Sequence, residues 1–223
     1  MVDTSLQRKN MVESQVRPSD ITDRRIMRSM LEVPREQFVD PAVRAIAYMD
    51  EDAPISAGDQ NSAQRYLLAP RTLAKLLQLA NISNTDVVLD VACATGYSAA
   101  VLSSMCGAVV AVEPDAELAQ RARQLLEALL IDNVIVVMGE AALGASDEAP
   151  FDAIVVQGLI SVMPPALLNQ LKDGGRLVAL NDDDGVTRAV VWSRVGTKFD
   201  RRPAFEMSGP RLAGFERPQT FAF

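Results

Sequence analysis

Histidine is absent from the 223 residues, which excludes Ser-His-Asp and Cys-His catalysis and the usual zinc sites that contain histidine. Cysteine is nearly absent, since Cys93 and Cys106 are the only two. Both lie in one predicted strand-helix unit and make no disulfide framework, which favours a reducing, cytoplasmic location. The chain also lacks an apolar run of signal-peptide length, or of the about 18 residues that span a membrane. We therefore expect a cytoplasmic protein that is not exported.

An excess of basic residues is missing as well. The chain has 22 Lys and Arg against 29 Asp and Glu, a net charge of -7. This charge opposes a broad attraction to phosphate backbones and anionic membranes, so neither nucleic acid nor a membrane is an expected partner. The hydrophobic residues, 48% of the chain, suffice for a substantial core at this length.

The sequence changes character near residue 80. Residues 19–49 have helical spacing of apolar residues with a proline break, residues 50–65 are polar and rich in turn formers, and residues 70–79 predict a further helix. We expect residues 1–80 to form helices and a substrate or lid loop that pack on a core formed by residues 81–223. The two parts are expected to form one compact domain. The sequence does not indicate the oligomeric state of the protein.

Short apolar, β-branched runs follow, and helical patterns separate the first three of them. They read VVLDV, AVVAVE, NVIVVM and FDAIVV. Nearly continuous apolar strands that alternate with helices indicate an α/β fold with a parallel, Rossmann-like sheet covered on both faces. Beyond them the sequence predicts a helix at 165–171, the strand RLVAL, a turn at NDDDG, the strand TRAVVWSRV and a last strand candidate at 215–223.

A tight turn of small residues follows the first of these strands. Residues 92–97 read ACATGY and lead into a helix, and such a turn lets backbone amides and a helix N-terminus approach a ligand closely. Glu113 ends the second strand, where the two hydroxyls of a ribose find a hydrogen-bond acceptor. The unit therefore predicts a ligand that contains adenosine.

Two kinds of cofactor fit this architecture. A nicotinamide dinucleotide needs the pattern Gly-x-Gly-x-x-Gly, of which the turn keeps only Gly96. Asp90 would repel a pyrophosphate but attract the ammonium or sulfonium group of S-adenosylmethionine, so the charge pattern favours the methyl donor. A turn without any ligand stays open as an alternative, and so does a role for Asp90 in capping local amides.

Two other features have simple structural interpretations. Cys93 has no histidine to activate it, and the need for a small residue in a tight turn explains its presence. The consecutive carboxylates at 182–184 precede Gly185 and predict a solvated turn between strands, so no metal site is assigned.

Several blocks of the sequence resemble, in the same order, those of the protein-L-isoaspartate O-methyltransferase family. They are NMVESQV, MLEVPREQFVD, AYMDEDAPI, VVLDVACATGYSAAVLSSM, VVAVEPD, APFDAIVV and LLNQLKDGGRLVAL. The resemblance implies an enzyme that uses S-adenosylmethionine to esterify the side-chain or α-carboxyl group of damaged aspartyl residues in proteins or peptides. It also implies a seven-stranded, mostly parallel sheet whose last hairpin introduces one antiparallel strand.

The resemblance also implies a set of cofactor-binding residues at the ends of the first strands. In this set Glu113 holds the ribose and Glu140 lies near the adenine. The full set is Asp90, Ala92, Cys93, Ala94, Gly96, Tyr97, Glu113, Pro114, Gly139, Glu140 and Gln157.

The chain departs from the family pattern at three places. One is Gly139-Glu140, where the family has Gly-Asp, and the longer carboxylate of Glu140 is still expected to reach the adenine amine. Ala92 and Ala94 replace two glycines of the turn, and each adds a methyl group where the backbone approaches the ligand. In the acceptor segment, residues 58–65 read GDQNSAQR, which leaves Ser62 as the one hydroxyl to orient the acceptor carboxylate and makes it the predicted catalytic residue. Asp59 adds a negative charge there. The alternative to an active enzyme is therefore a catalytically weak or silent relative that binds a nucleoside cofactor or a protein partner.

Overall fold

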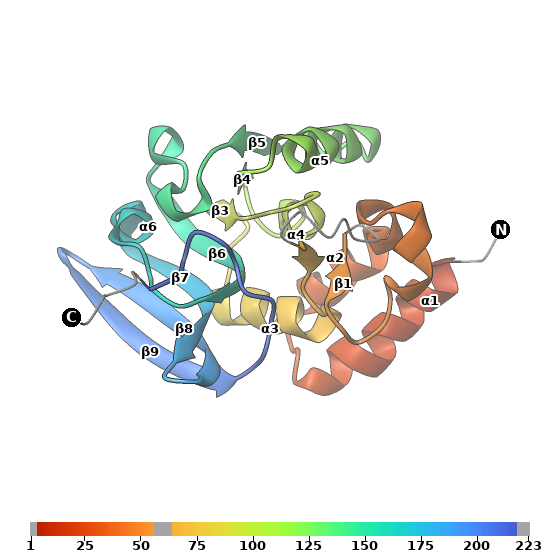
Figure 1. The fold of residues 1–223 in the computed structure, drawn as a ribbon, viewed down its shortest axis with the longest axis horizontal. Helices are drawn as coiled ribbons and strands as arrows, with labels where there is room; N and C mark the ends of the chain where they lie inside the picture. Colours follow the sequence, from red (N-terminus) through yellow and green to blue (C-terminus); the bar gives the residue numbers. More distant parts are fainter. Residues whose placement is uncertain (1–3, 56–63, 218–223) are drawn as a thin grey trace, which may run out of the picture.

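The computed structural model of the protein describes residues 4–55 and 64–217. Its main sheet has seven strands (Figure 1). In spatial order they are β5 (Val134–Met138), β4 (Ala108–Glu113), β3 (Val87–Val91), β6 (Phe151–Ile160), β7 (Leu171–Asp183), β8 (Val186–Val195) and β9 (Lys198–Glu206). Strands β3 to β7 pair in parallel, and β8 pairs antiparallel with both neighbours. The predicted mostly parallel sheet with one reversed strand is confirmed.

Both faces of the sheet are covered by other elements. Successive residues of a strand point to opposite faces, so neighbouring residues of β3 pack against different elements. On one face Val88 belongs to the same buried cluster as residues of α3 (Pro70–Ala80), α4 (Tyr97–Ser103) and α5 (Ala116–Ala128). On the other face Leu89 packs in a cluster with residues of α6 (Pro165–Asn169) and of the C-terminal segment. In the described part of the chain, no helix combines the length and the apolar character needed to cross a membrane.

Local sequence explains why α5 begins where it does and how closely it packs. Asp115 caps the helix, as the sequence predicts, since its carboxylate accepts hydrogen bonds from the amides of Glu117 and Leu118. Ala122 faces inward, and a side chain at Gly96 would bring a Cβ within 3.2 Å of the Ala122 Cβ. Small residues on both sides therefore let the turn after β3 lie directly against α5.

The N-terminal residues form a helical layer at the end of the molecule far from β9 (Figure 1). The helical prediction for residues 19–49 is confirmed, and α2 ends just before Pro34. Residues 4–16 are helical too. No helix was predicted there, because Met11 is the one buried residue of the first helix and a single apolar residue makes no helical pattern. The helical elements are α1 (Thr4–Met11), η1 (Val12–Val16), η2 (Arg17–Ser19), α2 (Arg24–Glu32), η3 (Arg35–Phe38) and η4 (Pro41–Ile46).

A small two-stranded sheet, which the sequence did not predict, lies within the first 80 residues. Strand β1 (Ala53–Pro54) pairs antiparallel with β2 (Tyr66–Leu67). This pairing places Ala53 opposite Leu67 and Pro54 opposite Tyr66. Ser62 and Asp59, which the sequence assigns to that segment, lie outside the described residues. The predicted division of the chain at residue 80 stays a prediction.

A strand is predicted at 215–223, and this prediction is wrong for residues 215–217, the part of the range that the structure describes. The last strand is β9, and residues 207–217 run back over the sheet without forming a strand. Phe215 is buried there, and its carbonyl accepts hydrogen bonds from the amides of Ser161 and Val162. The sequence of β9 is charged and its residues are mostly exposed, so it shows none of the apolar alternation by which strands are recognised.

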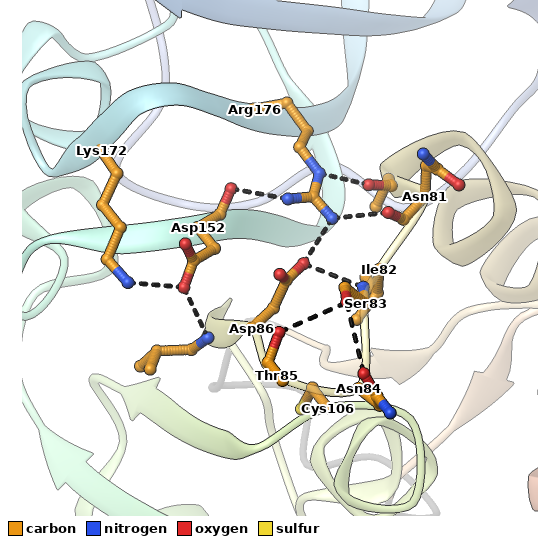
Figure 2. A network of polar contacts seen from close by, with 12 residues as sticks. Asn81, Ile82, Ser83, Asn84, Thr85, Asp86, Cys106, Asp152, Lys172 and Arg176 are labelled. Carbon is orange, nitrogen blue, oxygen red and sulfur yellow. Dashed lines mark hydrogen bonds and ion pairs between the residues drawn. The ribbon is translucent and has the colours of Figure 1, made fainter.

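A network of ionic contacts fixes the edge of the sheet where the parallel strands begin (Figure 2). The Arg176 guanidinium donates to the Asp86 carboxylate at 2.6 Å, to the Asp152 carbonyl at 2.9 Å and to the Asn81 carbonyl at 2.7 Å. Lys172 pairs with the Asp152 carboxylate at 2.7 Å. The network thereby ties the end of α3 to β6 and β7 and to the start of β3, at the edge opposite the candidate site.

Candidate active site

The turn after β3 takes the backbone shape that its sequence predicts for close contact with a ligand. Ala92, Ala94 and Gly96 all have positive φ, of 60°, 54° and 90°. This left-handed region favours glycine, because a Cβ there crowds the following carbonyl. The turn has thus kept a glycine-type conformation at the two positions where alanines stand.

Glu113 lies at the end of β4 with no exposed surface. Its carboxylate accepts from the backbone amide of Ala94 at 2.7 Å and from that of Asp115 at 3.1 Å. The guanidinium of Arg65 contributes two more hydrogen bonds, at 2.7 and 2.9 Å, one to each carboxylate oxygen. The carboxylate that the sequence predicts to hold the ribose is therefore paired with an arginine.

Asp90 is fully buried at the centre of the same edge. It accepts hydrogen bonds of 2.6 Å from the Ser98 hydroxyl and from the Gln157 amide of β6. Burial raises the pKa of Asp90 to about 7, and the two hydrogen bonds offset part of that rise. The structure thus places two predicted site residues, Asp90 and Gln157, in contact. Ser98, which was not predicted, is the second hydrogen-bond partner of the Asp90 carboxylate.

Cys93 and Tyr97 fill the space behind the turn. Burial raises the pKa of the Cys93 thiol well above its usual value, so the thiol stays protonated at neutral pH. The Tyr97 ring lies edge-on to Phe38, with 5.5 Å between ring centroids, and carries the Arg35 guanidinium 4.9 Å from its centroid. The Tyr97 hydroxyl is buried without a hydrogen-bond partner in the part of the chain that the structure describes.

The remaining predicted residues flank Glu113 on the β5 side. Pro114 follows it directly and is exposed, and the amide of Gly139 donates to the Glu113 carbonyl at 3.2 Å. Glu140 is exposed and begins a short 3-10 helix without capping it through its side chain. These residues line the edge where β4 and β5 end.

Residues of β2 close over this edge. Tyr66 and Leu67 line, with Cys93, Ser98 and Gln157, a space of only about 10 Å³. Such a volume has room for about one water molecule. Among residues 4–55 and 64–217, no group of three side chains is arranged to hold a metal ion.

The sequence matches one protein family over most of its length. Residues 6–195 match the family model described as Protein-L-isoaspartate(D-aspartate) O-methyltransferase (PCMT). The chain belongs to this family. A relative from Koribacter versatilis named protein-L-isoaspartate O-methyltransferase is 40% identical over 174 residues, which are 78% of this chain and 76% of that protein. A relative from Pelobacter propionicus named protein-L-isoaspartate O-methyltransferase 2 is 42% identical over 171 residues, or 77% and 73% of the two chains.

Solved structures share the fold of this protein-L-isoaspartate O-methyltransferase family member. One structure with that enzyme name has a TM-score of 0.81 at 24% identity and covers 93% of this chain and 66% of that chain. A protein from Plasmodium falciparum, solved in complex with S-adenosyl-L-homocysteine, has a TM-score of 0.74 at 21% identity and covers 91% and 96% of the two chains. The likeness confirms the Rossmann-like methyltransferase fold.

Arg65, like Ser98, is a residue of this site that was not predicted from the sequence. It stands at the end of the acceptor segment, 48 positions before Glu113. Nothing in the local pattern marks it, since an arginine after a polar loop is typical of a solvated surface. The topology alone brings β2 and the end of β4 together.

Proposed function

We propose that this family member transfers the methyl group of S-adenosylmethionine to the carboxylate of isoaspartyl or damaged aspartyl residues in proteins or peptides. The observation that carries the proposal is the turn at 92–97, which keeps its glycine-type backbone beside the buried carboxylate of Glu113. The family match over residues 6–195 supports the reaction. The scarcity of cysteine supports a cytoplasmic setting.

The residues at this edge suit S-adenosylmethionine, which has a ribose diol in its middle and a cationic amino-acid end. Glu113 offers the acceptor that the ribose hydroxyls need. Asp90, held by Gln157, offers a carboxylate to the cationic end, and a nearby positive charge favours its ionised form. Gly139 and Glu140 would lie beside the adenine, and the backbone amides of the turn would contact the bound cofactor.

The proposed chemistry needs little from the protein beyond orientation. When bound, S-adenosylmethionine supplies an electrophilic methyl group. A carboxylate acceptor is already ionised at neutral pH, so no general base is required and the absence of histidine is no obstacle. The protein holds the reactants in line, an effect that contributes roughly 7–11 kcal/mol in favourable cases. Ser62 is our proposal for the group that orients the acceptor.

A catalytically silent relative is the second candidate, and two observations favour it. The Glu113 carboxylate is paired with Arg65, and the space beside the turn is about 10 Å³. Family membership argues for the enzyme.

Calorimetric titration of the full chain with S-adenosylmethionine, S-adenosylhomocysteine and NAD separates the cofactor classes. We expect both sulfur compounds to bind and NAD to fail, because the turn lacks two of the glycines that a pyrophosphate requires. Binding of NAD alone would contradict the proposal. If none of the three compounds bound, the protein would have a role that does not involve a nucleoside cofactor.

A further inference from the structure

Arg65 and Glu113 meet in a bidentate pair at the centre of the proposed cofactor site. The two N–O distances are 2.7 and 2.9 Å, and Arg65 is 21% exposed whereas the Glu113 side chain is 0% exposed. Such fork-to-fork pairs are the strongest kind of side-chain hydrogen bond, because both partners are charged and planar. The pair is thus a specific contact in a largely dry environment.

The pair uses all of the hydrogen-bonding capacity that Glu113 has left. An ionised carboxylate offers about four acceptor positions. Two of them are taken by the amides of Ala94 and Asp115, and the Arg65 guanidinium takes the other two. A ribose presents two hydroxyl donors to a carboxylate at this position. The two N–H groups of Arg65 therefore stand where the two ribose hydroxyls need to bind.

Arg65 also holds the turn itself. Its guanidinium donates to the Ala92 carbonyl at 3.2 Å, so one side chain links the ends of β3 and β4. The Arg65 carbonyl accepts the Ile55 amide at 3.0 Å, which anchors its backbone next to β1. Rotation of the side chain alone can therefore release Glu113 while the small β1–β2 sheet stays paired.

We propose that Arg65 is an internal competitor of the cofactor, occupying the Glu113 carboxylate in place of the ribose hydroxyls and thereby setting the apparent affinity for S-adenosylmethionine. This inference rests on the proposed function of the site. The apparent dissociation constant equals the intrinsic constant divided by the fraction of molecules in which Glu113 is free. Any change that raises this fraction tightens cofactor binding in the same proportion.

The test measures binding of S-adenosylhomocysteine to the full chain by calorimetry in the parent and in R65A and R65Q. We expect R65A to bind at least tenfold more tightly, equivalent to about 1.4 kcal/mol, and R65Q to fall between R65A and the parent, since its amide still donates one hydrogen bond. The matched control is R71A. Arg71 lies nearby on α3 and pairs with Asp50 at 3.1 Å on the surface, half exposed, so its loss should change affinity less than twofold.

A second measurement separates competition from a general loss of structure. R65A leaves a buried carboxylate unpaired, which lowers its melting temperature without ligand. If Arg65 competes with the cofactor, saturating S-adenosylhomocysteine should raise the melting temperature of R65A and R65Q by more than it raises that of the parent. Variants that bind no better than the parent would overturn the inference and leave the proposed function standing. Absence of binding in the parent and both variants would overturn the two together.

Discussion

Ala92 and Ala94 hold a backbone conformation that favours glycine, with φ of 60° and 54°. For a residue with a Cβ this region costs roughly 1–2 kcal/mol, a strain that glycine relieves. Replacement of both alanines by glycine also removes two buried methyl groups and adds chain entropy to the unfolded state. A control must therefore share these two losses but not the strain.

Ala99 and Ala100 of α4 provide this control, because they are equally buried alanines in an α-helix. We expect A92G/A94G to be more stable than A99G/A100G by about 2–4 kcal/mol, the strain relieved at two positions. For a domain of this size the difference in melting temperature is roughly 4–16 °C. Thermal denaturation of the two double variants measures it, and A92G/A94G should also bind S-adenosylhomocysteine more tightly than the parent. If both double variants were destabilised equally relative to the parent, the claim that Ala92 and Ala94 strain the turn would be wrong.

Three further predictions concern charged groups of the site. In the R65A background, where no guanidinium occupies the carboxylate, E113A should weaken S-adenosylhomocysteine binding by about 1–3 kcal/mol, the usual effect of losing hydrogen bonds to a charged group, and unchanged binding in a titration would contradict the assignment. Burial raises the pKa of Asp90 from 3.8 to about 7, so its contribution to stability is full below pH 3.8 and is lost progressively as the pH rises to about 7. Urea denaturation at pH 5 and pH 8 should therefore show the parent losing stability relative to D90N, and a constant difference would argue against the shift. The parent should methylate an isoaspartyl peptide more slowly than a typical family member. D59Q should speed the reaction, because it removes a negative charge from the segment predicted to bind an anionic acceptor. An unchanged rate in D59Q would show that Asp59 does not slow the reaction.

The central strands could be predicted because burial on both faces makes their sequences almost continuously apolar. Strand β3 has the predicted bounds, Val87–Val91, and Asp115 caps the next helix as its sequence indicates. Strand β9 could not be predicted, because an exposed edge strand is held by pairing with β8 and not by apolar side chains.

The candidate site was predicted in part for the same reason. Glu113 ends β4, Asp90 is the residue before the last of β3, and Gln157 lies in β6 beside the end of β3. The carboxyl ends of such parallel strands meet at one edge of the sheet. Arg65 could not be placed from the sequence, since its contact with Glu113 depends on how the small β1–β2 sheet lies against the main one. Long-range charge pairs of this kind follow from the topology and leave no local pattern.

Transfer of a radiolabelled methyl group from S-adenosylmethionine to a synthetic isoaspartyl peptide tests the central claim most directly. The matched control is the same peptide with an ordinary aspartyl residue. Our account predicts label on the isoaspartyl peptide and none on the control, even if the rate is low. Cofactor binding with no label on either peptide would contradict the account and favour a catalytically silent relative.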